Sequence, residues 1–328
     1  MKTEKTIDVT ALGELLIDFT PGEISSQGFP TFEANPGGAP CNVLAMLAKL
    51  GRKAAFIGKV GDDMFGRFLK ERTLEQGICM DGLLFDKDVH TTLAFVQKLP
   101  NGDRDFSFYR KPGADIMITR DEVIAHKELI EQARIFHFGT LSMTDETAER
   151  ATVEALSIAK DTGALISFDP NYRAPLWDSE DAAKEKIAFG LRNCDILKIS
   201  DNEIELMTGT DDIAAGVAML KRDYGIPLIF ATLGPDGSSA YYKDLPACYE
   251  AGFVNPDTVE TTGAGDTFCA CALHHVLKYG LEDLTEAKLH ELLVYANAAA
   301  SLVTTRRGAL CVMPDAAEVE AYRNACKR

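Results

Sequence analysis

The chain has 328 residues, of which 46% are hydrophobic, and this is enough to build one large domain or two ordinary ones. Its 50 acidic residues outnumber the 34 basic ones, which gives a formal net charge of -16. A strongly acidic protein repels the phosphates of nucleic acids and anionic lipids, so neither is expected as the main partner, although a local basic pocket for one nucleotide stays open.

The cysteines and the N-terminal residues indicate the compartment. The eight cysteines are scattered and include no C-x-x-C pair, which is typical of buried thiols in a reducing compartment rather than of a zinc site or a disulfide framework. The first residues, MKTEKTIDVTALGELLIDF, lack the long apolar run and the cleavage site of a signal peptide. No apolar stretch reaches about 18 residues, so no membrane-spanning helix is expected. The sequence therefore predicts a cytoplasmic protein.

Short apolar runs alternate with longer amphipathic stretches along the whole chain. The predicted strands lie at 7–19, 54–61, 133–141, 164–171, 194–200 and 227–234. The predicted helices lie at 39–51, 63–77, 146–163, 201–209, 211–225, 266–280 and 287–305. Apolar strands that alternate with helices favour a mostly parallel sheet covered by helices on both faces.

Two segments, at about 25–38 and 89–111, interrupt this alternation. The second has alternating polar and apolar residues on either side of the turn cluster at 100–103, which predicts a β-hairpin. Such an insertion either covers an active site or is a surface hairpin without a role. We expect a single α/β domain over residues 1–328 with a discontinuous β lid formed by about 19–36 and 89–111.

The segment TTGAGDTF at 261–268 is the strongest local signal for chemistry. Its two glycines allow a tight turn before a helix, and the N–H groups of Gly263, Ala264, Gly265 and Asp266 can then converge on an anion at the helix N-terminus. Asp266 is either the N-cap of that helix or a carboxylate that accepts the proton of a hydroxyl attacking a bound phosphoryl group. These residues alone leave both interpretations open.

Other phosphate-binding patterns do not occur in the sequence. There is no G-x-x-x-x-G-K-[ST] segment of a P-loop, no G-x-G-x-x-G dinucleotide motif, and no H-R-D or D-F-G pair of a protein kinase.

The chain resembles the PfkB (ribokinase-like) family of carbohydrate kinases over essentially its whole length. The resemblance rests on TTGAGDTF together with NPGGAPCNVLAMLAKLG, and on GELLIDF, AAFIGKVGDDMFG, FYRKPGAD, FDPNYRAPLW, LKISDNEIELMTG, ATLGPDGS and TRRGALCVMP in the family's order. It implies a ribokinase-like three-layer α/β/α domain with a mostly parallel central sheet and a small β lid. It also implies transfer of the γ-phosphoryl group of MgATP to a primary hydroxyl of a ketose. GGAPCN, FYRKPGAD and FDPNYRAPLW are most similar to bacterial fructokinases, which implies D-fructose as the substrate and fructose 6-phosphate as the product.

The resemblance assigns the catalytic and sugar-binding residues. Asp266 resembles the catalytic base, and Gly263, Ala264 and Gly265 resemble the anion hole. The substrate-binding residues that it implies are Asp18, Gly37, Gly38, Asn42, Arg110 and Arg173. Each of these also has an ordinary structural explanation: a strand-end turn for Asp18, turn glycines, a helix N-cap near residue 43 for Asn42, and surface ion pairs for the arginines.

The resemblance also implies sites for the nucleotide and for ions. The nucleotide-binding residues are Asn171, Ser200, Thr232, Gly234, Gly237 and Asn297, where Ser200 takes the place of an asparagine that many members have. Glu203 resembles the acid that organises Mg²⁺, commonly through water. Some members bind K⁺ near the anion hole, which here would involve Glu260 and the segment around Gly308. Asn297 could equally be a buried packing amide.

Three alternatives stay open at this stage. A 2-keto-3-deoxygluconate kinase would use the same chemistry and would need a cation for the substrate carboxylate, which Arg110 or Arg173 could supply. A nucleoside kinase would need a flat aromatic base pocket, which no segment indicates. A non-catalytic sugar-sensing protein on this fold would be indicated by loss of Asp266 or of the glycines, and both are present. The apolar alternation in TTLAFVQKL favours a homodimer through the lid.

Overall fold

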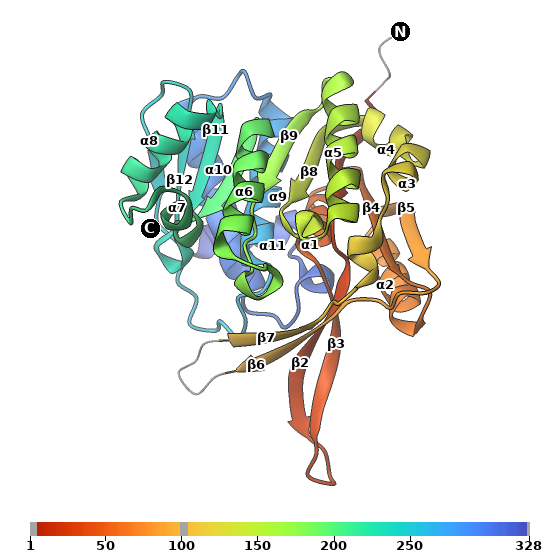
Figure 1. Cartoon of the computed structure of the whole chain (residues 1–328). Coiled ribbons are helices and arrows are strands. Elements are labelled where there is room, and N and C mark those ends of the chain that lie inside the picture. The colour runs from red at the N-terminus through yellow and green to blue at the C-terminus, as the bar shows by residue number, and fades with distance from the viewer. Residues whose placement is uncertain (1–4, 99–103, 327–328) are drawn as a thin grey trace.

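The computed structural model describes residues 5–98 and 104–326, which form a large helix-covered sheet and a small second sheet (Figure 1). In this part of the chain the large sheet has nine strands in the order β13-β12-β11-β10-β9-β8-β1-β4-β5. Their bounds are β1 Ile7–Leu12, β4 Ala54–Gly61, β5 Cys79–Asp86, β8 Ala133–Gly139, β9 Leu165–Asp169, β10 Ile196–Ser200, β11 Leu228–Thr232, β12 Ser238–Tyr242 and β13 Cys248–Glu250. The strands from β5 to β11 pair in parallel, and only β12 and β13 are antiparallel to their neighbours.

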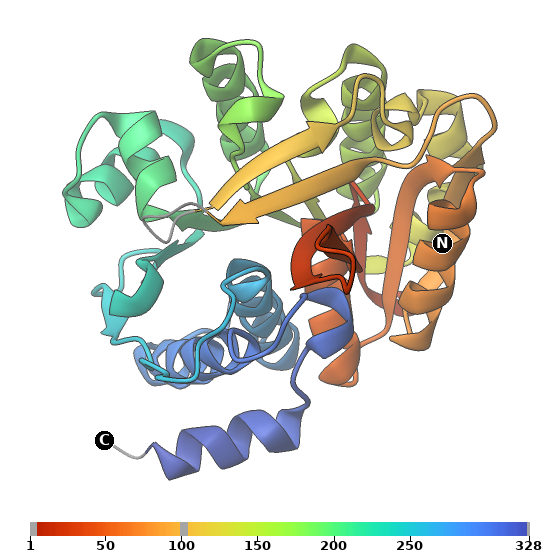
Figure 2. The same ribbon diagram turned by 90° about the horizontal axis from the view of Figure 1, so that it is seen from below.

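Helices cover both faces of the large sheet, because alternate residues of each strand are apolar on both sides. One hydrophobic core lies under α1 Ala39–Lys49, α2 Met64–Glu75, α9 Ala264–Tyr279, α10 Glu286–Val303 and α11 Ala316–Ala325. The other lies under α3 Arg120–Ala125, α4 Lys127–Glu131, α5 Glu146–Asp161, α6 Glu180–Asn193, α7 Asp201–Thr208 and α8 Ile213–Tyr224. Figure 2 shows these two helix layers on opposite sides of the sheet. The predicted three-layer fold is confirmed.

The second sheet projects from one end of this body (Figure 1). It consists of β2 Leu16–Ile24, β3 Pro30–Gly37, β6 Leu93–Lys98 and β7 Arg104–Tyr109, in the order β3-β2-β6-β7. The β2–β3 and β6–β7 pairs are antiparallel, and β2 and β6 join them in parallel. The turn cluster predicted at 100–103 lies outside the described residues.

The single strand expected over 7–19 is wrong. The chain forms β1 in the large sheet, leaves it at Gly13, and re-enters as β2 in the small sheet at Leu16. The sequence pattern could not reveal this change, because the apolar run continues from one sheet into the other. The change of sheets places Glu14 and Asp18 at the junction of the two sheets.

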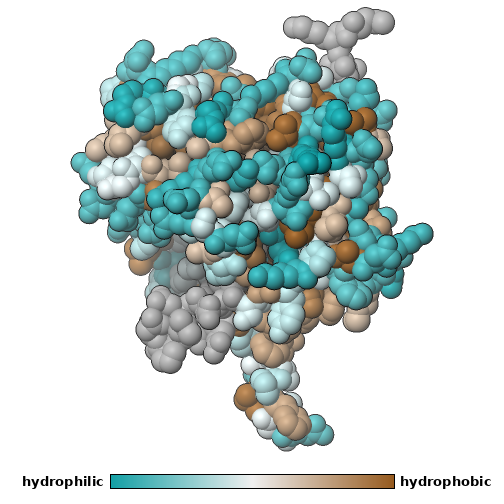
Figure 3. Space-filling view, in the orientation of Figure 1, coloured by the Kyte–Doolittle hydropathy of each residue, from teal (hydrophilic) through white to brown (hydrophobic). Residues whose placement is uncertain are grey.

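The surface of the molecule is largely hydrophilic in the view of Figure 3, but apolar side chains gather on the projecting β2–β3 hairpin. Ile24, Phe29 and Phe32 are exposed there. None of the helices in the described part of the chain combines the length and apolar character needed to cross a membrane.

Candidate active site

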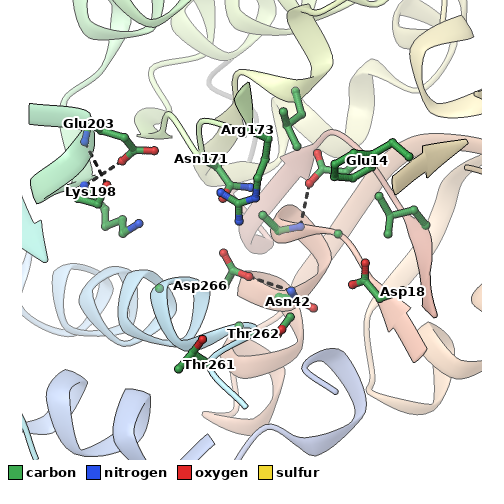
Figure 4. A pocket seen from close by; sticks show the side chains of 18 residues that line it. Glu14, Asp18, Asn42, Asn171, Arg173, Lys198, Glu203, Thr261, Thr262 and Asp266 are labelled. Carbon is green, nitrogen blue, oxygen red and sulfur yellow. Dashed lines mark hydrogen bonds between the residues drawn. The ribbon is translucent and has the colours of Figure 1, made fainter. Parts of the chain in front are cut away.

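A cavity of about 480 Å³ lies where the carboxyl ends of β9 and β10, the N-termini of α1 and α9, and the small sheet meet. Ligands of open α/β sheets bind at the carboxyl ends of the strands, so this position is the expected one. Its lining residues are Glu14, Leu16, Asp18, Gly38, Ala39, Asn42, Phe108, Leu141, Asn171, Arg173, Lys198, Ser200, Glu203, Thr261, Thr262, Gly263, Gly265 and Asp266 (Figure 4).

The N-terminus of α9 opens into this cavity. Gly263 is the N-cap, with φ 80°, and a side chain there would lie 2.7 Å from the Cβ of Ala309, so only glycine fits the turn. No side chain caps this helix. The first N–H groups of a helix have no intrahelical partner. The Ala264 N–H contacts the Thr261 carbonyl at 3.3 Å, and the N–H groups of Gly265 and Asp266 are left for an anion in the cavity.

Asp266 lies in the first turn of α9 and is 9% exposed. Since Gly263 is the N-cap, the N-cap alternative for Asp266 is wrong. Its carboxylate instead accepts a hydrogen bond of 2.8 Å from the side-chain amide of Asn42 (Figure 4). Burial and the nearby Asp169 carboxylate raise the pKa of Asp266 to about 6, against the opposing hydrogen bond from Asn42.

Asn42 comes from α1, which begins at Ala39, as the predicted helix at 39–51 does. The N-cap of α1 is Gly38, so the prediction that Asn42 caps a helix near residue 43 is wrong. The Asn42 side chain is 3% exposed, and its carbonyl oxygen has no hydrogen-bond partner among the described residues. A buried amide oxygen without a partner is costly, so a ligand hydroxyl that donates to it would be favoured.

Asp18 lies opposite Asn42, on β2 of the small sheet (Figure 4). Its position explains Gly37 on the neighbouring strand β3, because any side chain there would collide with the Asp18 carboxylate. Burial raises the pKa of Asp18 to about 7, and the Glu260 carboxylate adds to this shift. Gly38 has φ 121°, and a side chain there would meet the backbone carbonyl of Glu14.

Glu14 lines the cavity but was not singled out from the sequence. It is 4% exposed, and its carboxylate accepts a hydrogen bond of 2.8 Å from the Ala39 N–H at the start of α1. Burial raises its pKa to about 7. No local signal distinguishes it, because the turn between β1 and β2 becomes visible only once the two strands are seen in different sheets.

Lys198 and Asp169 were also not predicted as site residues. They lie on neighbouring strands β10 and β9, and the ammonium of Lys198 is 3.1 Å from the Asp169 carboxylate. The available signal was a lysine with the apolar residues Ile196, Leu197 and Ile199 around it in a predicted buried strand.

Glu203 lies at the start of α7, where it forms a capping box with Ser200. One carboxylate oxygen accepts the Ser200 N–H and the other accepts the Tyr172 N–H, each at 2.8 Å. Each oxygen keeps a further lone pair, so the residues fit a water-mediated rather than a direct Mg²⁺ site. Asn171 has φ 48°, and the exposed Arg173 guanidinium donates to the carbonyl of Tyr172 at the cavity rim.

Arg110 does not line this cavity. It is 6% exposed, and its guanidinium is held by the Asp115 carboxylate at 2.7 Å, the Thr144 hydroxyl at 2.8 Å and the Leu141 carbonyl at 2.7 Å. An arginine with these partners is not placed to receive a phosphate or a substrate carboxylate. Arg110 thus joins Asp115, Thr144 and Leu141 and does not face the cavity.

Four residues predicted to bind nucleotide lie away from the lining of the described cavity. Thr232 ends β11, and Gly234 and Gly237 lie in the turn to β12, where Gly237 has φ 110° and a side chain would collide with the Glu250 carbonyl. Asn297 is 6% exposed, accepts from the Ser238 hydroxyl and donates to the Glu250 carbonyl. Asn297 is therefore a buried amide that ties α10 to the β12–β13 edge.

The two halves of the predicted K⁺ site come together next to the anion hole. Glu260 is 7% exposed, and its carboxylate accepts the Gly308 N–H at 3.2 Å and the Thr262 hydroxyl at 2.7 Å. Among the described residues, no group of three or more His, Cys, Asp and Glu side chains is arranged to hold a metal ion.

Comparisons with known proteins agree with this geometry. Residues 6–316 match the family described as pfkB family carbohydrate kinase. The chain is 40% identical to fructokinase-1 of Zea mays over 313 residues, which covers 95% of this chain and 96% of that protein. A probable fructokinase-2 of Arabidopsis thaliana is 39% identical and covers 96% of this chain and 95% of its own length.

Solved structures lead to the same family. The fructokinase of Xylella fastidiosa with bound ATP superimposes with a TM-score of 0.87 at 28% identity, covering 99% of this chain and 100% of that one. A fructokinase double mutant of Vibrio cholerae, in its fructose-, ADP- and potassium-bound form, gives a TM-score of 0.86 at 26% identity, covering 98% and 99%.

Proposed function

The chain belongs to the pfkB family of carbohydrate kinases, and we propose that it is an ATP-dependent fructokinase that converts D-fructose to fructose 6-phosphate. The observation that carries this proposal is the buried Asp266 at the open N-terminus of α9, which is hydrogen-bonded to Asn42 and shares the cavity with Asp18. One side of this cavity suits a phosphoryl group and the other suits a polyhydroxylated ligand.

In this proposal the sugar lies between α1 and the small sheet. The Asp18 carboxylate accepts hydrogen bonds from sugar hydroxyls, and the unpartnered Asn42 oxygen accepts another. Gly37 and Gly38 leave room for the sugar beside Asp18. Phe108 and Leu16 of the small sheet cover it and exclude water, which limits ATP hydrolysis.

Asp266 then acts as the general base. Its carboxylate accepts the proton of the primary hydroxyl as the hydroxyl oxygen attacks the γ-phosphorus of ATP and the bond to ADP breaks. The N–H groups of the first turn of α9, from Gly263, Ala264 and Gly265, stabilise the charge on the transferred oxygens.

The nucleotide lies along the carboxyl ends of β9, β10 and β11. Asn171, Ser200 and Arg173 flank its phosphates, and the β11–β12 turn with Thr232, Gly234 and Gly237 lies near its ribose. Glu203 would hold Mg²⁺ through water, and the ion would supply positive charge against the phosphates. Glu260 and the segment at Gly308 form the K⁺ site.

A 2-keto-3-deoxygluconate kinase is the disfavoured alternative. The sequence relatives compared above are fructokinases. Its substrate would bring a carboxylate into a cavity lined by Glu14 and Asp18, and Arg110, one of the two candidate cations, is held by Asp115 instead.

The finer features of the proposal concern the lid and the compartment. The single domain over 1–328 closes its lid, made from about 19–36 and 89–111, over the sugar. The exposed aromatic side chains of that lid pair two chains into a homodimer, and the enzyme acts in the cytoplasm without nucleic-acid or membrane partners.

The test is ADP release from MgATP, measured by a coupled assay with fructose, 2-keto-3-deoxygluconate, ribose, tagatose, glucose and adenosine in turn. The proposal expects the highest kcat/KM for fructose, and parallel assays with and without K⁺ show whether that ion activates. A preference for 2-keto-3-deoxygluconate would overturn the substrate, and no turnover with any acceptor would overturn the catalytic function.

A further inference from the structure

Lys198 is a positive charge buried in the middle of the large sheet. It is 8% exposed, while its neighbours on β10, Leu197 and Ile199, are fully buried and apolar. Removing an ammonium group from water is costly unless it is paired and hydrogen-bonded. A leucine at this position would be buried at a lower free-energy cost, so packing alone does not explain the lysine.

Asp169 on the neighbouring strand satisfies only part of this charge. The Lys198 ammonium lies 3.1 Å and 3.3 Å from the two oxygens of the Asp169 carboxylate. An ammonium has three N–H groups, so donors remain for another acceptor. Burial by itself would lower the pKa of Lys198, but the carboxylates of Asp169, Glu203 and Asp266 outweigh it and raise the pKa, so the group is charged.

The ammonium lies next to the anion hole of α9. A side chain at Gly265 would be 3.2 Å from the Lys198 nitrogen, so the bare backbone of Gly265 leaves Lys198 an open path into the cavity. Figure 4 shows the Lys198 side chain extending toward the centre of the cavity, on the side of Asp266. An anion held by the first turn of α9 would therefore lie beside this ammonium.

The charge balance of the cavity requires such a cation. Carboxylates from Glu14, Asp18, Glu203 and Asp266 line it, whereas its described lining includes only two basic residues, Lys198 and Arg173. Arg173 is exposed at the rim. Lys198 is thus a buried cation of this lining that lies beside the first turn of α9.

We propose that Lys198 is a catalytic residue whose ammonium contacts a non-bridging oxygen of the phosphoryl group during its transfer, while Asp169 holds the ammonium in place. The inference rests on the proposed kinase function. In this step the phosphorus–oxygen bond to ADP breaks, the bond to the sugar oxygen forms, and the hydroxyl proton moves to Asp266. Lys198 keeps its protons and neutralises the charge that spreads over the transferred oxygens.

The first test separates this role from simple pairing with Asp169. Because Lys198→Met alone leaves a buried carboxylate unpaired, the comparison is between Asp169→Asn and the double variant Asp169→Asn/Lys198→Met, in which both groups are neutral. We expect the second substitution to lower kcat by a further factor of about 100, with little change in KM for fructose. If Lys198 only neutralised Asp169, it would cause no further loss.

The second test measures binding by calorimetry and does not need turnover. Fructose, MgADP and aluminium fluoride together mimic the transferred phosphoryl group, whereas MgADP alone lacks it. Lys198→Met is expected to weaken binding of the mimic about 100-fold and to leave MgADP binding unchanged. The control is Lys186→Met, which removes a lysine of α6 that is paired with Glu149 of α5.

A folded Lys198→Met protein that binds the mimic as tightly as the wild type would overturn the assignment, whatever the activity of the Asp169 variants. Failure of the proposed function would give a different result from failure of the Lys198 assignment. A wild-type protein that released no ADP with fructose would contradict the proposed fructokinase activity.

Discussion

The buried carboxylates of the site, Asp266 and Asp18, predict a dependence of the rate on pH. A general base works in its ionised form, and the pKa values of Asp266 and Asp18 are raised to about 6 and about 7. We therefore expect kcat/KM for fructose to fall as the pH decreases from about 7 to below 6 and to level off at higher pH. Because the two carboxylates interact, the apparent pKa values belong to the pair.

Asn42 offers a way to shift that profile. Its hydrogen bond favours the ionised form of Asp266, so Asn42→Leu is expected to move the acidic limb to higher pH, besides raising KM for fructose. The exposed Asn202 on α7 gives the matched control, Asn202→Leu. The measurement is the pH profile of kcat/KM for the three proteins, and an unmoved limb in Asn42→Leu would contradict the coupling.

At the scale of single residues, the site residues that belong to short sequence motifs could be predicted. Asp266, Gly263, Gly265 and Asn42 were singled out and are brought together in one cavity. Lys198 and Asp169 were missed because they come from separate strands and meet only through the sheet, and Glu14 because it lies in the turn where the chain changes sheets. Arg110 and Asn297 were predicted as ligand contacts but do not line the cavity, and a sequence does not show that they bond to Asp115 and Ser238.

At the scale of elements, the start of α1 depends on Gly38. A side chain there would meet the Glu14 carbonyl, a backbone atom that cannot move aside cheaply. Gly163, at φ 70° with open space around it, serves as the control. Gly163→Ala is expected to cost about 1–2 kcal/mol of unfolding free energy from its left-handed backbone alone. Gly38→Ala should cost clearly more, as measured by urea unfolding, and equal losses would argue against the collision.

The junction between β7 and the main body depends on the buried pair of Arg110 and Asp115. Arg110→Met removes one partner and is expected to lower the unfolding free energy by about 3–5 kcal/mol, because it leaves an uncompensated buried carboxylate. The double variant Arg110→Met/Asp115→Leu should recover much of this loss. Urea unfolding curves of both variants provide the measurement, and a double variant no more stable than the single one would refute the explanation.

Element types were easier to predict than their ends or partners. The long periodic helices at 146–163 and 287–305 appear as α5 and α10, with ends that differ by one to a few residues. The change of sheets between β1 and β2 was not predicted, since both strands are equally apolar and only pairing with β4 or β3 distinguishes them.

At the scale of the whole molecule, the outer face of the small sheet predicts self-association. Phe95 packs against Phe32 and Tyr109 with ring centroids 5.4 Å apart, and Phe32 and Tyr109 remain 45% and 66% exposed. Strands β3 and β7 are edges with unpaired backbone groups. We expect a dimer at micromolar concentration in sedimentation velocity experiments.

Substitutions locate that interface. Phe32→Glu and Tyr109→Glu should shift the sedimentation coefficient toward the monomer, because a charge would be buried between two chains. Val254, 78% exposed and outside the small sheet, supplies the control Val254→Glu. A wild-type protein that sediments only as a monomer would refute the dimer without affecting the catalytic proposal.

The central claim is that Asp266 is the base of a fructose kinase, and fructose-dependent ADP release by the wild type and by Asp266→Asn tests it most directly. The substitution keeps the size of a side chain that is buried and hydrogen-bonded to Asn42, so fructose binding should persist while kcat falls by about 100- to 10,000-fold. An Asp266→Asn protein that turned over fructose at the wild-type rate would contradict the account.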